Sequence, residues 1–410
     1  MVTQNMNKFG FLSTQRKLAR SFRFLLLPLM LLFILLACSE AADPERLVKI
    51  NREIQEEFAP DRRVAVYDLN LRAMPDKIVI EGETDRERAL ENLIDKLKQF
   101  DLEIVNKAIL LPDSSIGDYP YAVVNNSVAN IRSEARHSAE LATQAILGTG
   151  LKVLKIKGDF YLVQTPDNYI AWVDHGGVTL MTEDEYAAWN KVPKVIYLKT
   201  FGKVYLEEND ELAIQGDLVL GSTMQLVGED GAYYRVRYPD GRTGFIPREE
   251  AQAYDKWISE LTPTPESLEL YSRSLLGAPY LWGGTSSKGM DCSGFTKTVF
   301  LMNGLVIPRD ASQQIHAGRE VDPDLNFKDL KKGDLMFFGK RATDSTRQRV
   351  THVAIWLGNG KGEFIHSSGR VRLSSVDPGS ELFDGFNTNR YLGSRRYLGE
   401  NHPGLSPLTP

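Results

Sequence analysis

The spacing of apolar residues changes along the chain, and each change marks a new region. Between residues 46 and 58, and again after Thr84, apolar residues recur every three or four positions, which predicts two helices. Thr84 and Glu87 have the spacing of a capping box, so we expect the second helix to begin there. Residues 45–118 are therefore expected to form a small α+β module. The strands expected in it are residues 64–71, 77–81 and 102–110.

Two later segments repeat one another at an offset of 73 residues. Each has alternating apolar residues, a Pro-Asp turn and a closing pair of an aromatic and an aliphatic residue, a pattern typical of small β-barrels. We expect one barrel over residues 119–192 and a second over residues 193–255. Gly158, Tyr161, Val163, Pro166, Asp167, Trp172 and Val173 of the first repeat match Gly231, Tyr234, Val236, Pro239, Asp240, Phe245 and Ile246 of the second.

The sequence Thr-Pro-Thr-Pro at residues 262–265 interrupts this pattern and predicts a linker. Residues 266–400 then combine helical and strand-like spacing, which indicates a further domain. The whole chain is thus expected to be an α+β protein of several domains. Helices are expected at residues 267–276 and 292–301, and strands at residues 334–338, 351–357 and 363–366.

This last domain contains a candidate nucleophile. Cys292 lies at the start of an expected helix, where the helix dipole and unpaired N–H groups favour a thiolate. His352 lies 60 residues later in an expected strand, and His366 lies in the next strand. A thiol, a base and a group that orients the base make a nucleophilic site. Taken singly, however, a buried cysteine is more often an inert apolar residue.

A zinc site is another use for one cysteine and two histidines. No short Cys/His pair with the spacing of metal ligands supports it. We therefore expect neither a metal nor a cofactor.

The N-terminus has the anatomy of a secretory signal. Five basic residues precede or adjoin the apolar run 24–36, which is broken by Pro28 and is shorter than the roughly 20 residues that a spanning helix needs. Residues 35–38, Leu-Leu-Ala-Cys, resemble a bacterial lipobox. We expect residues 1–37 to be a lipoprotein signal peptide and Cys38 to carry lipid. The alternatives are a plain signal peptide with an incidental cysteine and, less favoured, a spanning anchor.

Removal of residues 1–37 leaves 44 Lys and Arg against 54 Asp and Glu, a net charge of −10. This charge disfavours binding to the phosphate backbone of nucleic acids. We expect no nucleic-acid partner, and a protein held in the cell envelope by lipid on Cys38, at the outer membrane or a periplasmic face.

Several motifs carry resemblances to known families. The two repeats resemble bacterial SH3-like domains, with residues 129–134 as the first strand and loop, and the N-terminal module is similar to BON-like domains. The last domain resembles the NlpC-type cell-wall cysteine peptidases, whose fold is papain-like. This last resemblance rests on residues 280–284 (Tyr-Leu-Trp-Gly-Gly), 291–295 (Asp-Cys-Ser-Gly-Phe), 308–309 (Pro-Arg), 333–335 (Gly-Asp-Leu), 351–355 (Thr-His-Val-Ala-Ile) and 364–366 (Phe-Ile-His).

The NlpC resemblance implies a role for each residue of the candidate site. Cys292 would be the nucleophile, His352 the general base and His366 the residue that orients it. Tyr280 would assist the oxyanion, with the Cys292 amide as a second donor, although an aromatic residue here could merely pack at the edge of the cleft. Thiolate attack would form an acyl-enzyme, His352 would protonate the leaving amine, and water would release the acid.

Two SH3-like repeats before such a peptidase resemble the γ-D-glutamyl-L-diamino acid endopeptidases of the YkfC kind. The resemblance implies cleavage of murein peptides after γ-D-Glu and recognition of a free N-terminal L-Ala in a closed cleft. A buried ammonium needs carboxylates and hydroxyls around it, although single carboxylates are often only solvated. The implied substrate-binding residues are Glu134, Tyr169, Asp291, Ser293, Arg309 and Asp310.

Two features leave this substrate assignment open. Arg309 could hold a substrate carboxylate or the Asp310 backbone. The charged segment 340–349, inserted before the His352 strand, could alter the rim of the cleft or only decorate the surface.

Two other classes of protein compete with a murein-peptide peptidase. One is a catalytically silent lipoprotein whose barrels bind peptidoglycan, and the complete set of Cys292, His352 and His366 argues against it. The other is an acyltransferase with the same Cys–His chemistry, and the paired repeats argue against that. The barrels could also only space or shape the enzyme, because a fold does not define a function.

Overall fold

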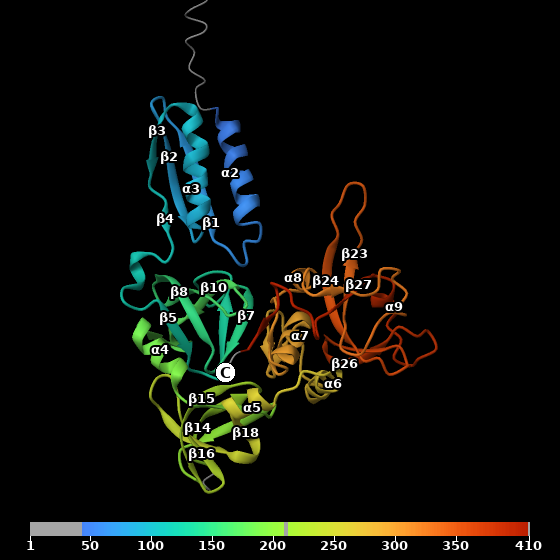
Figure 1. Ribbon diagram of the computed structural model, residues 1–410. Coiled ribbons are helices and arrows are strands. Elements are labelled where there is room, and N and C mark those ends of the chain that lie inside the picture. Colours follow the sequence, from blue (N-terminus) through green and yellow to red (C-terminus); the bar gives the residue numbers. More distant parts are fainter. Residues whose placement is uncertain (1–42, 209–211, 409–410) are drawn as a thin grey trace, which may run out of the picture. The chain divides into compact units, whose positions relative to one another are not determined.

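The computed structural model describes residues 43–208 and 212–408 (Figure 1). It divides into two compact units. One contains residues up to Pro60 together with Tyr67–Ile109, and the other contains Asp61–Val66 together with the chain from Leu110 onward. The expected signal peptide and Cys38 lie outside the described residues. Over the described ranges, no helix is both long and apolar enough to cross a membrane.

The first unit packs two helices against a small sheet. The helices bury apolar stripes that include Leu47 and Ile54 in α2 and Leu90 and Leu93 in α3. Strand β1 pairs antiparallel with β2, and β2 pairs in parallel with β3. The α+β character of this module is confirmed. Its elements are α2 (Pro44–Phe58), β1 (Tyr67–Ala73), β2 (Lys77–Thr84), α3 (Glu87–Leu97), β3 (Glu103–Asn106) and β4 (Ile109–Leu110).

The capping box expected at Thr84 is wrong. Thr84 is fully buried at the end of β2, opposite Tyr67, and the N-cap of α3 is Arg86. The Thr84 hydroxyl accepts from the Arg86 N–H, so it ends the strand rather than capping the helix at its third residue. The first strand also starts later than expected, because Val64 closes a turn with the Asp61 carbonyl.

The 73-residue repeat is confirmed strand by strand. The first barrel has the order β11-β5-β8-β9-β10-β6-β7, and the second has the same order with every strand number raised by seven. The strands are β5 (Tyr121–Val124), β6 (Val128–Arg132), β7 (Leu141–Ile146), β8 (Gly150–Lys157), β9 (Phe160–Gln164), β10 (Ile170–Asp174) and β11 (Val178–Met181), then β12 (Lys194–Tyr197), β13 (Phe201–Tyr205), β14 (Ile214–Val219), β15 (Thr223–Asp230), β16 (Tyr233–Arg237), β17 (Thr243–Pro247) and β18 (Ala251–Ala253).

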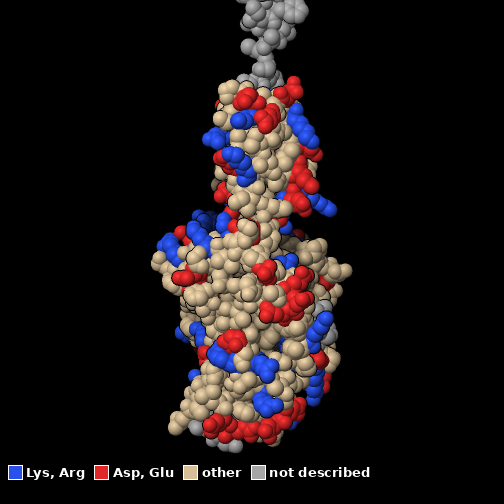
Figure 2. Space-filling view, turned by 90° about the vertical axis from the view of Figure 1, so that its left-hand side faces the viewer, with Lys and Arg blue, Asp and Glu red and all other residues tan. Residues whose placement is uncertain are grey.

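Each barrel is followed by a short helix, α4 (Glu183–Lys191) after the first and α5 (Tyr254–Glu260) after the second. Alternating apolar residues fill the barrel interiors, as period-two patterning requires. On the face shown in Figure 2, a row of acidic side chains lies along the lower edge, and acidic and basic side chains are mixed above it.

The C-terminal domain, called the catalytic domain below after the expectation from its motifs, is an antiparallel sheet with α7 packed against β24 and β25. The order of the sheet is β22-β27-β23-β24-β25-β26. Its helices are α6 (Pro265–Ser274), α7 (Cys292–Leu301), α8 (Ala311–Gln314) and α9 (Gly385–Thr388). Its strands are β19 (Thr285–Ser286), β20 (Gly289–Met290), β21 (Leu305–Val306), β22 (Arg319–Glu320), β23 (Leu335–Lys340), β24 (Arg349–Trp356), β25 (Glu363–Ser368), β26 (Arg370–Ser375), β27 (Tyr391–Arg396) and β28 (Ser406–Pro407).

The helices and strands expected here are confirmed, although helix α6 begins two residues earlier than expected. Helix α6 begins at Pro265 because Thr264 caps it through a capping box with Ser267. The second half of the Thr-Pro-Thr-Pro segment is therefore the start of a helix, and proline suits its first position, where no N–H is needed.

Buried hydrogen bonds join the first barrel to the catalytic domain. The Thr285 N–H and hydroxyl donate to the side-chain and backbone oxygens of Gln144, both at 2.9 Å. Gly283 has a φ of +78°, and a Cβ there would overlap the Leu141 carbonyl oxygen of β7. Only glycine can meet both demands, so the Trp-Gly-Gly loop is shaped by contact with the barrel.

Candidate active site

The thiol of Cys292 lies at the first residue of α7. Asp291 is the N-cap, and its carboxylate accepts from the Gly294 N–H at 2.7 Å. The helix folds here because the cap satisfies one of its free donors, while Phe295 and its apolar neighbours bury the other face. The Cys292 amide remains at the helix start, where it can serve an oxyanion.

Burial dominates the electrostatics of the nucleophile. The Cys292 side chain is 7% exposed, and burial, with the Asp291 carboxylate second, raises its pKa to about 12. The backbone of Val353 and Ser293 and the Arg309 guanidinium oppose this rise in pKa. The resting nucleophile is therefore a neutral thiol beside strand β24.

His352 lies next to Val353 on β24. Burial, and then His366, lowers the pKa of His352 to about 3, so the imidazole is a neutral base. Its Nε2 lies 2.7 Å from His366 Nδ1. His366 is completely buried, burial lowers its pKa to about 3, and its Nε2 lies 3.1 Å from the Ser374 hydroxyl. Ser374 ends this row of hydrogen bonds.

Sequence reasoning missed Ser374. It lies on β26 and reaches His366 only because β25 and β26 form a hairpin. An alternation of polar residues along β26 is the one signal that could have indicated an inward-facing hydroxyl.

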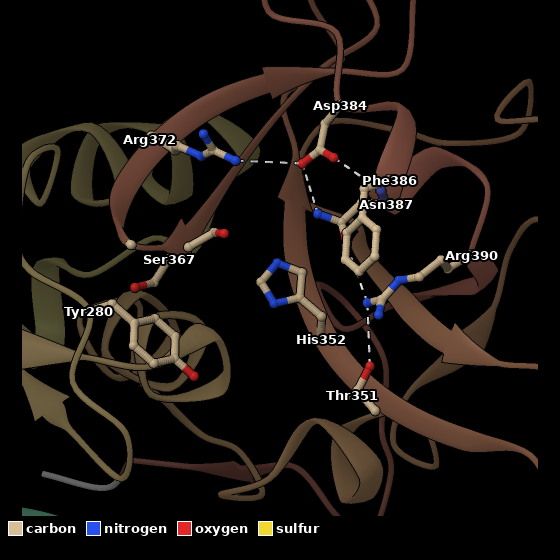
Figure 3. A pocket seen from close by; sticks show the side chains of 11 residues that line it. Tyr280, Thr351, His352, Ser367, Arg372, Asp384, Phe386, Asn387 and Arg390 are labelled. Atoms are coloured by element: carbon tan, nitrogen blue, oxygen red, sulfur yellow. Dashed lines mark hydrogen bonds and ion pairs between the residues drawn. The ribbon is translucent and has the colours of Figure 1, made fainter.

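Tyr280 lines the same cleft as His352. Burial, followed by the charges of Cys292 and Asp291, raises the pKa of Tyr280 to about 12, so its hydroxyl stays protonated and able to donate. Figure 3 shows His352 between Tyr280 and Arg390 in this cleft, which has a volume of about 490 Å³.

Asp291, Ser293 and Arg309 form a buried cluster under the helix start. Arg309 is 1% exposed, and its Nη atoms donate to the Asp291 carboxylate at 2.6 and 3.1 Å and to the Ser293 hydroxyl at 2.9 Å. Its Nε donates to Thr143 Oγ1 of the first barrel at 3.0 Å. None of these hydrogen bonds goes to the Asp310 backbone.

Asp310 and Tyr169 come together at the boundary of the first barrel. Burial, and next the Asp310 carboxylate, raises the pKa of Tyr169 to about 12. Arg63 donates to Asp310 Oδ2 at 2.7 Å and to both Asp61 carboxylate oxygens at 2.8 Å. Arg63 and Asp61 were not found from sequence, because Arg63 lies 247 positions from Asp310 and no local pattern links them.

Glu134 is not brought to this cluster. It is fully exposed in the turn between β6 and β7, and its carboxylate accepts from Arg136 at 3.0 and 3.1 Å. No hydrogen bond or ion pair among the described residues joins Glu134 to the catalytic domain. Glu134 and Arg136 thus form a solvent-exposed ion pair within one turn.

Two further expectations concern metal and the charged insertion. Within residues 43–208 and 212–408, no three His, Cys, Asp or Glu side chains gather as metal ligands. Residues 340–349 form the exposed tip of the β23–β24 hairpin, closed by a pair of hydrogen bonds between Thr343 and Thr346.

Comparisons with known proteins match two parts of the chain. Residues 277–395 match the NlpC/P60 family, and residues 131–177 match the bacterial dipeptidyl-peptidase Sh3 domain. The γ-D-glutamyl-L-lysine dipeptidyl-peptidase of Bacillus cereus is 32% identical over 271 residues, which cover 63% of this chain and 76% of the relative.

A second relative, the peptidoglycan endopeptidase RipB of Mycobacterium tuberculosis, is 38% identical over 117 residues, or 25% of this chain and 44% of the relative. Among solved structures, a crystal structure of an NlpC/P60 family protein from Bacillus cereus aligns with a TM-score of 0.56 and 29% identity. The alignment covers 68% of this chain and 99% of that one.

Proposed function

Because the chain belongs to the NlpC/P60 family of cysteine peptidases, we propose that it hydrolyses murein peptides between γ-D-Glu and an L-diamino acid when their N-terminal L-Ala is free. The observation that carries this proposal is the charge of the cluster around Arg309. The names of the relatives, which refer to γ-D-glutamyl peptides and to peptidoglycan, support the substrate class.

The cluster is one cation short. Asp61, Asp291 and Asp310 supply three carboxylates, and Arg63 and Arg309 supply two guanidinium groups, all linked by ion pairs. The protein interior disfavours an uncompensated charge, so a substrate ammonium would balance the cluster. The Asp310 side chain is 27% exposed and the Asp61 side chain 29%, so both carboxylates are open to a substrate.

The chemistry follows from the neutral pair of Cys292 and His352. As the sulfur attacks the γ-carbonyl carbon of D-Glu, His352 takes the thiol proton, so neither Cys292 nor His352 is charged before substrate arrives. The Tyr280 hydroxyl and the Cys292 amide donate to the oxyanion. His352 then gives its proton to the leaving α-amine, and water, deprotonated by the same imidazole, releases the dipeptide.

His366 holds His352 in the orientation that faces the thiol, and Ser374 holds His366. A base with a fixed ring needs no rotation at the moment of proton transfer. Asp291 and Ser293, in this proposal, act with Arg309 to position the helix start and the ammonium site.

The N-terminal residues add a proposed location. A lipobox-like Leu-Leu-Ala-Cys ending at Cys38 suits a protein tethered to a membrane in the cell envelope, where released murein peptides occur. Replacement of Cys38 by Ser should abolish fractionation with membranes and remove the mass of the acyl groups. Unchanged fractionation would contradict lipid attachment.

The test of the proposed function uses the peptide L-Ala-γ-D-Glu-L-Lys and the same peptide acetylated at its N-terminus, with products identified by mass. We expect cleavage of the free-amine peptide alone, and none by Cys292→Ala. Asp310→Asn should lose most of its preference for the free amine, whereas Asp324→Asn, an exposed carboxylate of the same domain, should keep it. Equal cleavage of both peptides by the unaltered protein would refute the ammonium site.

A further inference from the structure

The cluster at Arg309 is one charged site, and the cleft that His352 lines is a second. The cleft contains two guanidinium groups and one carboxylate, so it carries one net positive charge, opposite in sign to the cluster at Arg309. The lining residues with ionic or aromatic side chains are Tyr280, His352, Arg372, Asp384, Phe386 and Arg390 (Figure 3).

Arg390 is held in the cleft without an acidic partner among the described residues. Its guanidinium lies 4.3 Å from the centre of the Phe386 ring, and its Nη2 donates weakly to Thr351 Oγ1 and Asn387 Oδ1, both at 3.3 Å. Its Nε is buried and has no hydrogen-bond partner among the described residues. A buried donor without a partner is unfavourable, which indicates a site for an acceptor.

Asp384 does not fill that role. Its carboxylate accepts from the Asn387 side chain at 2.7 Å and backbone at 3.0 Å and lies 3.8 Å from Arg372. The Asp384–Arg372 pair therefore balances itself and leaves Arg390 as the uncompensated cation of the cleft.

The chemistry of the reaction decides which part of a substrate reaches Arg390. His352 must protonate the leaving amine, so the released residue has to lie against His352. The ammonium site, which would hold the other end of the peptide, belongs to the cluster of Asp310 and Arg309. The cleft towards Arg390 is thus left for the released residue.

We propose that this cleft binds a carboxylate of the released diamino acid and that Arg390 is its ligand. A planar guanidinium matches a carboxylate better than any other side chain does. This inference rests on the proposed function and names the leaving-group specificity of the same site. Two carboxylates have this chemistry, the α-carboxylate of any diamino acid and the side-chain carboxylate of diaminopimelate.

Four peptides separate the two sources. They share L-Ala-γ-D-Glu and end in L-Lys, in L-Lys amide, in meso-diaminopimelate, or in meso-diaminopimelate amidated at its α-carboxyl group. Faster cleavage of the peptide that ends in L-Lys than of the one that ends in L-Lys amide would show that the cleft binds the α-carboxylate. Retention of activity on the α-amidated diaminopimelate peptide, together with low activity on both lysine peptides, assigns the side-chain carboxylate.

The variant Arg390→Gln tests whether Arg390 binds the carboxylate of the released residue. We expect kcat/KM on the preferred acid to fall about tenfold to a hundredfold, the usual value of one charge-assisted hydrogen bond, so that acid and amide are cleaved at similar rates. Arg347→Gln, an exposed arginine of the β23–β24 hairpin tip, should keep the ratio of the unaltered protein. An unchanged ratio in Arg390→Gln, or equal cleavage of all four peptides by the unaltered protein, would overturn the inference.

A binding measurement separates this inference from the proposed function. Calorimetry would compare Cys292→Ala with Cys292→Ala/Arg390→Gln, using Nε-acetyl-L-lysine and meso-diaminopimelate as probes. Weaker binding of at least one probe by about tenfold in the double variant supports the carboxylate site even if no γ-D-glutamyl peptide is cleaved. Equal binding of both probes by the two variants overturns it, even if cleavage occurs as proposed.

Discussion

Arg309 offers the sharpest test of how the site is held together. Replacing it with Met keeps most of the side-chain volume and removes the cation that pairs with Asp291. The Asp291 carboxylate would then stay buried, at 6% exposure, without the two charged hydrogen bonds of 2.6 and 3.1 Å. Loss of one partner of a buried ion pair costs about 3–5 kcal/mol in the free energy of unfolding.

The structure places the expected loss at the lower end of that range. Asp291 keeps the Gly283 and Gly294 N–H groups and the Ser293 hydroxyl as donors, which partly solvate its charge. We expect Arg309→Met to lose about 3 kcal/mol, or about 1 M in the urea midpoint at a slope of about 3 kcal/mol per M. Its activity should fall as well, because the guanidinium opposes the rise in the Cys292 pKa.

Urea unfolding followed by tryptophan fluorescence measures the change, with Arg347→Met as the exposed control. The double variant Asp291→Asn/Arg309→Met should recover part of the lost stability, because no carboxylate is left unpaired. A single variant within about 0.5 kcal/mol of the unaltered protein, with a raised KM alone, would refute this reasoning and favour a role for Arg309 in holding a substrate carboxylate.

Three other outcomes follow from the site. Ser374→Ala should lower kcat several-fold and leave KM nearly unchanged in steady-state peptide hydrolysis, since the hydroxyl hydrogen-bonds to His366. A change in KM alone would contradict this. Gly283→Ala should cost about 2 kcal/mol more in thermal unfolding than Gly277→Ala, which has a similar positive φ but open space at its Cβ, and equal costs would contradict contact with the barrel. Stability should fall as the pH drops from about 6.5 towards 3, because the His366 pKa is lowered to about 3 in the folded protein and only the unfolded chain takes up the proton. By pH 5 this one group should cost about 2 kcal/mol, and His366→Gln should flatten the urea-midpoint profile over that range.

The sequence was a good guide wherever one local pattern decides the structure. The offset of 73 residues predicted two barrels with the same strand order because period-two apolar patterning determines which face of each strand is buried. The start of α7 at Cys292 was equally readable, since a capping aspartate precedes an apolar helix. At Thr84 the same kind of reasoning failed, because pairing with Tyr67 keeps that residue in a strand.

The candidate site was only partly readable. Cys292, His352 and His366 could be named from motifs. The structure places His352 Nε2 2.7 Å from His366 Nδ1. Glu134 was assigned by resemblance to the ammonium site, yet its carboxylate binds Arg136 in its own turn. The residue that pairs with Asp310 is Arg63, which also pairs with Asp61.

By itself the sequence predicted the order of the modules, the repeat and the residues proposed as nucleophile and bases, because each depends on neighbours within a few residues or on a regular period. Only the tertiary structure decided which charges meet. The pairs Arg63–Asp310 and Arg309–Asp291, and the unpartnered Nε of Arg390, depend on how separate strands and loops pack. Charge compensation acts through space over a few ångströms, so no linear pattern records it.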